Sequence, residues 1–385
     1  MPDKPNQTGK PNQTDKPNHI EKPGYAEQKP VSLLHAFGIP VLLCALGIAG
    51  AVLFIEQKKH WPSPTSPTGT DWRHIPPEWI THQHDSLFVC PIEGRPTCFT
   101  VWPNSNDAGS TFIIGTSNPN ALWFFDSTEN LLRKMDLPSE PRAIAVGTAD
   151  TIFTDKIVIA HPTHIALYPT EQGGEPEQNG RNFWRFESGV RIHSLALTPD
   201  YLFAADSGNC CIYRLNTDGD LDLTFGEFVV YTAPIAMTYA PRADLLYIAN
   251  PGKYRVEVFT QSGLSKPELM WGESSSNLDS FIGCCNPVHL SVLEDGGVIT
   301  VEKSASRIKI YRWDHESGRM TLDGVVAGWD ILERFPADLA RFPMQPGGRD
   351  FSAMPLSDGR IAVFDFNSAV LRVFSPHYAL TSRRD

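Results

Sequence analysis

The stretch SLALTPDYLFAADSGNCCIYRLNTDG, residues 194–219, alternates short apolar runs with turns, and it decides the fold. It contains an apolar strand, a turn with Pro and Asp, a second apolar strand that ends at Asp206, a short loop and a third strand. The same order of elements occurs in residues 236–263, 289–318 and 351–376, and more loosely in 142–171. Strand-rich repeats of this length are typical of β-propeller blades.

A polar residue ends the second strand of each copy, and the spacing of these residues tests the repeat. These polar residues are His161, Asp206, Asn250, Glu302 and Asp365. They are separated by 45, 44, 52 and 63 residues, and an aliphatic side chain lies six positions after each of them. Stepping back 45 residues from His161 reaches Thr116, which obeys the same rule. The sequence therefore predicts an all-β fold, a six-bladed propeller over residues 86–378, with insertions near 264–283 and 329–349.

The last copy has only three strands, so the ring needs a further strand to close. We expect SLFVCPI, residues 86–92, to supply the outer strand of the last blade, because this closure hides an edge that would otherwise invite aggregation. A disulfide between Cys90 and Cys98 would hold the junction.

The segments outside the repeats have different compositions. Residues 1–30 are polar and rich in Lys-Pro-Asn, which predicts a disordered tail. Residues 31–55 are apolar, without charge from Ala36 to Ile55, which predicts one transmembrane helix. A Pro-rich linker is expected over residues 56–85, and a short C-terminal tail over 379–385.

The compartment follows from cysteine usage, since the flanking lysines and arginines are balanced. Six of the seven cysteines lie after the apolar segment, and structural disulfides need an oxidising compartment. We expect a single-pass protein of the cell inner membrane with its propeller on the periplasmic, extracytoplasmic side. The net charge of −11 argues against nucleic-acid binding, which needs clustered Lys and Arg.

The repeat resembles the NHL repeat. Pro141, Pro234 and Pro287 match its first proline, and Asp206 with Asn209 matches its Asp and Asn pair. Glu302 and His161 depart from the Asp of the pattern. With GCCNP at residues 283–287, the chain looks like a membrane-anchored bacterial subgroup of NHL propellers that lacks an assigned activity.

Two doubled cysteines, Cys210-Cys211 and Cys284-Cys285, are expected on one face of the propeller. That face carries the loops leading into each first strand and the loops joining second to third strands. We expect a ring disulfide within each pair, and above all at Cys284-Cys285. Three alternatives stay open: buried cysteines without a bond, pairing between the two loops, and a four-thiolate metal site.

The same face is the expected binding surface, because rigid strands there hold variable loops around a central funnel. Its candidate residues are Arg142, His193, Asp206, Asn250, Cys284, Cys285, His289, Glu302 and Asp365. The sequence contains no recognisable catalytic motif, so we expect a docking or sensing module with a membrane or extracytoplasmic protein partner.

Two other functions stay open. NHL-like propellers include metal-dependent lyases and lactonases. That resemblance implies a divalent ion held by Asp206, Asn250 and Glu302, with His193 or His289 as base. The doubled cysteines would instead suit a thiol/disulfide electron-transfer accessory. The sequence identifies no cofactor.

Overall fold

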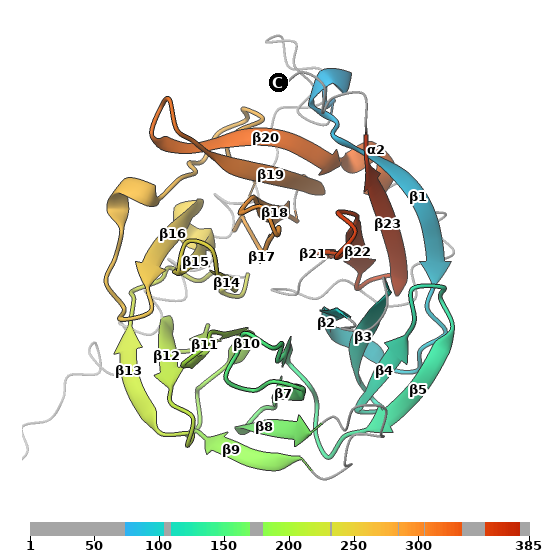
Figure 1. Cartoon of the computed structure of the whole chain (residues 1–385), viewed down its shortest axis with the longest axis vertical. Coiled ribbons are helices and arrows are strands. Elements are labelled where there is room, and N and C mark those ends of the chain that lie inside the picture. The colour runs from blue at the N-terminus through green and yellow to red at the C-terminus, as the bar shows by residue number, and fades with distance from the viewer. Residues whose placement is uncertain are drawn as a thin grey trace, which may run out of the picture. The chain divides into compact units, whose positions relative to one another are not determined.

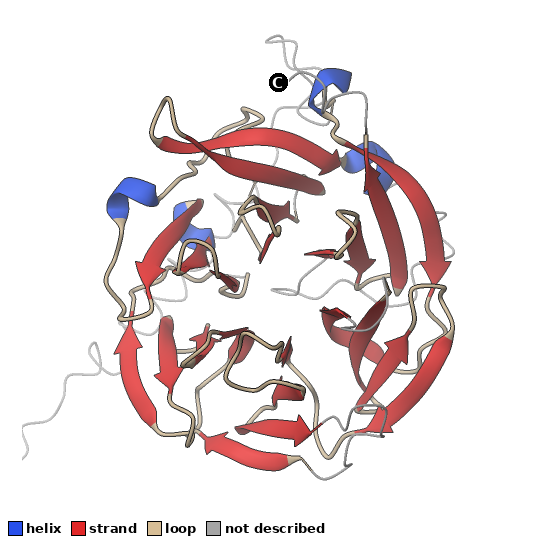
Figure 2. Cartoon of the chain, viewed as in Figure 1, coloured by secondary structure: helices blue, strands red, loops and turns tan. Residues whose placement is uncertain are grey.

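Six antiparallel sheets are arranged in a ring around a central axis (Figure 1). The computed structural model describes residues 74–103, 109–169, 180–231, 233–283, 285–303, 305–332 and 351–377. All of them belong to one compact unit, Pro67–Asp385, and the other unit is Met1–Ser66. Strands dominate the ring, as Figure 2 shows, so the predicted all-β, six-bladed propeller is confirmed.

Each sheet is one blade, and in blades one to five the strands run in chain order from the axis outward. Blade one contains β2 (Arg95–Pro103), β3 (Ser110–Ser117), β4 (Ala121–Phe125) and β5 (Leu131–Asp136). Blade two contains β6 (Ala143–Val146), β7 (Lys156–Ala160), β8 (His164–Pro169) and β9 (Arg181–Arg185). Blade three contains β10 (Ile192–Leu197), β11 (Leu202–Asp206), β12 (Cys211–Leu215) and β13 (Leu221–Phe225).

The second half of the ring departs more from this plan. Blade four contains β14 (Met237–Ala240), β15 (Leu245–Asn250) and β16 (Arg255–Thr260). Blade five contains β17 (His289–Val292), β18 (Val298–Glu302), β19 (Arg307–Asp314) and β20 (Arg319–Ala327). Blade six contains β21 (Phe351–Pro355), β22 (Ile361–Asp365), β23 (Val370–Pro376) and β1 (His82–Val89). The described helices are short: η1 (Pro77–Trp79), η2 (Pro251–Lys253), η3 (Pro267–Leu269) and α2 (Trp329–Leu332).

The ring closes as the sequence predicts. Strand β1 pairs antiparallel with β23, from His82 opposite Pro376 to Val89 opposite Val370. It begins at His82, inside the segment assigned to the linker, and therefore covers the outer edge of blade six over a longer distance than expected.

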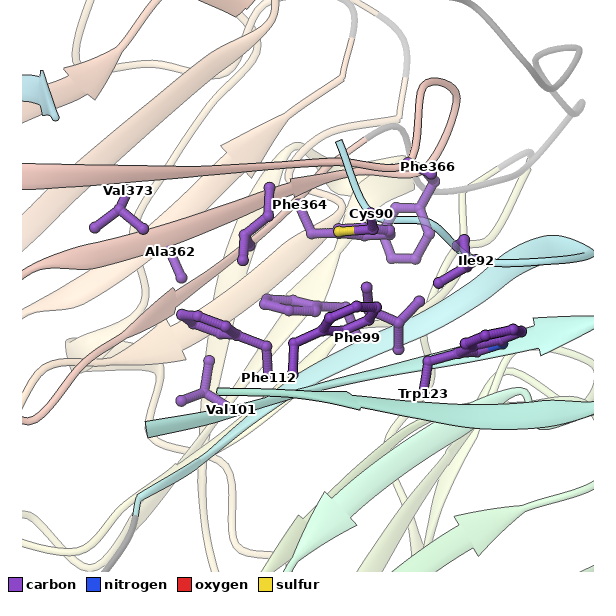
Figure 3. Close-up of a cluster of buried hydrophobic side chains, with 14 of the residues drawn as sticks. Cys90, Ile92, Phe99, Val101, Phe112, Trp123, Ala362, Phe364, Phe366 and Val373 are labelled. Carbon is purple, nitrogen blue, oxygen red and sulfur yellow. The ribbon is translucent and has the colours of Figure 1, made fainter. Parts of the chain in front are cut away.

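Hydrophobic side chains hold neighbouring blades together. Among the described residues, one buried cluster lies between each pair of adjacent blades. Figure 3 shows the cluster between blades six and one, where the rings of Phe99 and Phe364 stack with centroids 5.2 Å apart. Middle strands such as β11 are buried on both faces because each contacts a blade on either side, whereas the outer strand β5 is mostly exposed.

Blade four uses part of the predicted insertion, residues 264–283, in place of a fourth strand. Trp271 forms an antiparallel bridge with Val256 of β16, and the Lys266 amide donates to the carbonyl of Val258 (2.8 Å). This segment covers the edge of β16 without forming a regular strand. Most of the second predicted insertion lies outside the described residues.

The predicted transmembrane helix, residues 31–55, and both polar tails also lie outside the described residues. Within the described ranges, no helix is long and apolar enough to cross a membrane.

Candidate functional site

All six inner strands line a central channel with a volume of about 230 Å³. Among the described residues that line it there is no Asp, Glu, Lys or Arg. His193 of β10 and His289 of β17, both predicted site residues, contribute to the wall. The channel therefore offers hydroxyl, imidazole and apolar groups, and it is suited to neutral ligands more than to ions.

Hydroxyl groups of this wall connect neighbouring blades. Ser194 Oγ donates to the carbonyl of Met237 (3.2 Å), which joins blades three and four. Ser291 Oγ donates to the carbonyl of Ala353 (2.7 Å), which joins blades five and six. The amide of Ala353 in turn lies 3.5 Å from His289 Nδ1. The inner strands are thus linked to one another as well as packed.

The polar residues that end the second strands do not line the channel, and they are buried. They lie one strand further from the axis than the channel wall. In five blades each is bonded to the side chain seven positions later, on the third strand. The pairs are Thr116–Trp123 (3.1 Å), His161–Tyr168 (3.2 Å), Asp206–Tyr213 (3.0 Å), Asn250–Glu257 (2.9 Å) and Glu302–Lys309 (2.6 Å). Their polar groups satisfy one another inside the fold, where an unpaired group would be costly.

Several of these residues also hold the loop that leads into the first strand of their own blade. Asp206 Oδ1 accepts from the amide of Arg191 (2.7 Å), and Asn250 Oδ1 accepts from that of Val229 (3.0 Å). Glu302 Oε2 accepts from the amide of Ile282 (2.9 Å). These predicted site residues therefore position the loops of the expected binding face, which we call the front face.

Two further predicted residues have local partners. Asp365 Oδ2 accepts from Ser368 Oγ (2.5 Å) and Asp365 Oδ1 from the amide of Asn367 (2.8 Å), which closes the loop between β22 and β23. Arg142 is half-buried, and its Nε lies 3.6 Å from a carboxylate oxygen of Glu140. Neither residue lines the channel.

Glu302 and Lys309 form a fully buried ion pair, 2.6 Å between Oε1 and Nζ. Lys309 Nζ also donates to the carbonyls of Ser280 (2.7 Å) and Leu278 (3.1 Å), and it lies 4.7 Å from the ring centre of Phe281. Burial lowers the pKa of Lys309, and the carboxylate of Glu302 opposes that shift. The pair ties the segment before β17 to blade five.

The residues do not fit the divalent ion implied by the lyase resemblance. Asp206, Asn250 and Glu302 belong to three different blades, and each is already bonded inside its own blade. Over the described ranges, no group of three or more His, Cys, Asp or Glu side chains is placed to hold a metal.

The structure corrects two of the disulfide predictions, because no disulfide joins two of the described cysteines. Cys90 packs in the cluster between blades six and one. The Sγ of Cys98 instead lies on the opposite side of β2, 3.6 Å from the carbonyl of Pro141 at the start of blade two. Phe99, the next residue of β2, packs in the same cluster as Cys90, so Cys98 points to the other side of the strand. The predicted Cys90–Cys98 bond is therefore wrong.

The predicted ring at Cys210-Cys211 is also wrong. Cys210 has a left-handed backbone with φ of 57° and ends the loop, while Cys211 begins β12 with its side chain buried. Burial raises the pKa of the Cys211 thiol, which disfavours the reactive thiolate. Cys284 lies outside the described residues, so the ring at Cys284-Cys285 stays a prediction.

The third-strand partners were not among the predicted site residues. Tyr168, Tyr213, Glu257 and Lys309 each lie seven residues after a second-strand polar residue, a spacing that is visible in the repeat. Tyr231 was not predicted as a binding residue either. It lies on the front-face loop leading into blade four and is 70% exposed.

The buried ion pair gives a stability prediction. Replacing Glu302 with Gln leaves the Lys309 ammonium buried without a carboxylate, and we expect the free energy of unfolding to fall by about 3–5 kcal/mol. The double variant Glu302→Gln/Lys309→Met should lose much less than the sum of the single variants. Urea unfolding measures both, with Lys134→Met at the exposed pair Lys134–Glu93 as a control that should change little. Additive single effects would contradict the prediction.

Two buried histidines predict a loss of stability in acid. Burial, aided by Arg312 near His82 and by His164 near His161, lowers the pKa of each from 6.5 to about 4. The unfolded chain therefore takes up protons first, so the free energy of unfolding should fall as the pH drops from about 6.5 to about 4. The loss should reach at most about 3 kcal/mol for each histidine.

Denaturant melts between pH 7 and pH 4 test this dependence. His161→Gln should make the loss shallower, whereas His315→Gln, at an exposed position, should leave it unchanged. An unaltered pH dependence in His161→Gln would show that His161 is not responsible.

Comparisons with known proteins agree with the propeller fold. No protein-family model matches the sequence, and no curated protein is significantly similar to it, so the NHL resemblance stays a prediction. A solved protein of unknown function from Bacteroides thetaiotaomicron is similar in structure, with a TM-score of 0.52 and 13% identity over 74% of this chain and 70% of that chain.

Two lyase structures are more distant. One is a catalytically inactive virginiamycin B lyase from Staphylococcus aureus with quinupristin, with a TM-score of 0.46 and 14% identity over 74% of this chain and 83% of that chain. The other is a streptogramin B lyase, with a TM-score of 0.46 and 10% identity over 78% of this chain and 100% of that chain. At these identities the comparisons assign no activity to this chain. Its own sheets show that it is a six-bladed β-propeller.

Proposed function

We propose that this protein is a membrane-anchored, extracytoplasmic docking or sensing module of the NHL-like type. Its front face would bind a membrane or extracytoplasmic protein. The observation that carries the proposal is the use of the strand-closing polar residues inside the fold. Asp206, Asn250 and Glu302 fix the loops that the front face presents, and they are not placed to act on a substrate.

The loop leading into blade four shows how such a surface is built. Several hydrogen bonds hold it. The amide of Val229 donates to Asn250, and its carbonyl accepts from the amide of Gly252 (2.9 Å). The amide of Phe228 donates to the carbonyl of Cys210 (3.0 Å), and that of Ile235 to Ser207 Oγ (2.9 Å). Tyr231 is exposed between these anchors. A tyrosine on a restrained loop loses little conformational entropy on binding, and tyrosines often dominate protein interfaces.

The channel supports binding more than catalysis. It contains no carboxylate, lysine or arginine among its described lining residues, and the histidines His193 and His289 come from different blades. The enzyme and electron-transfer alternatives have no specific observation in their favour, since the expected ion ligands are engaged elsewhere and no disulfide joins two described cysteines.

The docking proposal predicts that one face matters for binding. Tyr231→Ser in the full-length chain should reduce cross-linking to a membrane or extracytoplasmic partner in native membranes by at least fivefold. Leu264→Ser is the matched control, because Leu264 is also exposed (60%) but follows the end of β16 on the opposite face. The assignment of the front face would be overturned if both variants cross-linked as well as the unchanged protein. It would also be overturned if both variants lost cross-linking to the same extent.

The anchoring proposal predicts a defined topology, with the chain before Val31 cytoplasmic and the chain after Gln57 outside. Protease added to cells with a permeabilised outer layer should degrade the propeller of the full-length chain and spare the N-terminal tail. A propeller that becomes sensitive only after the inner membrane is lysed would refute this orientation and the compartment argument with it.

A further inference from the structure

A second cavity, of about 500 Å³, lies on the opposite face of the disc, which we call the back face. The turns that join first to second strands and third to fourth strands form this face. The cavity lies between blades five and six, and Leu293, Ile310 and Leu356 give it apolar walls. It shares no lining residue with the central channel.

The two ends of the propeller meet at this cavity. Thr81 and His82, where the chain begins the closing strand, line it together with Pro376 and His377, where the last strand ends. The amide of His377 donates to the carbonyl of Thr81 (2.7 Å), which fixes this junction. The chain after His377 therefore continues from the rim of the cavity.

The described residues of the cavity rim are acidic on balance. They include the carboxylates of Glu294, Asp295 and Asp323, and the guanidinium groups of Arg242 and Arg312. Arg312 is held between Asp295 (2.5 Å) and Asp323 (2.7 Å). The side chain of Glu294 is 89% exposed, and its contact with Arg242 is long, at 3.8 Å. Glu294 is thus accessible to a second cation.

The residues that follow His377 are Tyr-Ala-Leu-Thr-Ser-Arg-Arg-Asp, 378–385, with two arginines and one aspartate. In an extended chain Tyr378 and Leu380 point to the same side, and Arg383 lies about 10 Å beyond Leu380. Apolar side chains next to the attachment point would meet the apolar walls, and the arginines would reach the acidic rim. A tethered segment also acts at an effective concentration in the millimolar range, which favours it over a separate peptide.

We propose that residues 378–384 bind in this cavity, with Tyr378 and Leu380 against its apolar walls and Arg383 or Arg384 at Glu294. The bound segment, attached at the end of blade six, would contact blade five at Leu293, Ile310 and Glu294. This proposal is independent of the function proposed for the front face.

A peptide-binding experiment tests the proposal. The full chain shortened after His377 should melt a few degrees below the unshortened chain, and a synthetic peptide of residues 378–385 should bind it and restore the melting temperature. Leu380→Ser in the peptide should weaken binding at least tenfold. Replacing Arg383 and Arg384 with Gln in the peptide, or Glu294 with Gln in the shortened chain, should weaken it about two- to fivefold. Glu316→Gln, in an exposed turn outside the cavity, is the matched control and should have no effect.

Each other result contradicts the proposal. If the shortened chain melts at the same temperature and does not bind the peptide, residues 378–384 do not occupy the cavity. If the peptide binds the unshortened and shortened chains equally well, residues 378–384 do not fill the cavity in the unshortened chain. Binding that is insensitive to both Leu380→Ser and Glu294→Gln would place the segment elsewhere on the surface.

Discussion

The architecture depends on a polar pair that recurs where the second strand of a blade meets the third. Asp206 at the end of β11 is opposite Cys211, and Tyr213 lies two residues further along the same side of β12. The carboxylate therefore reaches the tyrosine hydroxyl, and on its other side it reaches the amide of Arg191 in the incoming loop. One buried side chain thus connects two strands and the loop that arrives from the previous blade.

The chemistry of this pair varies from blade to blade while its geometry stays the same. Thr116 with Trp123 is neutral, Asn250 with Glu257 carries one charge, and Glu302 with Lys309 carries two opposite charges. Because burial penalises any unpaired polar group, each first residue requires a complementary second one. A regular series of polar residues near the mouth of a propeller therefore indicates a requirement of the fold before it indicates a ligand site.

The strands and the closure were predictable because they depend on local alternation and a repeated length. The end of β11 at Asp206 and the pairing of β1 with β23 follow directly from such patterns. The cysteine bonds were not predictable in this way, because they depend on which side of a strand each thiol occupies. Cys98 contacts blade two while Cys90 packs towards blade six, a difference that spacing along the chain does not reveal.

Within the part of the chain that the structure describes, departures from the repeat are concentrated around blade four. Its fourth strand is replaced by an irregular segment that contacts β16 through Trp271, and Lys309 of blade five anchors the end of that segment at Ser280. The loop before β14, which exposes Tyr231, lies on the same blade. Loops on a rigid scaffold can change without disturbing the core, so differences in binding are expected to arise where the repeat is least regular. Among the described sectors, blade four is therefore the one whose loops can change most without disturbing the core.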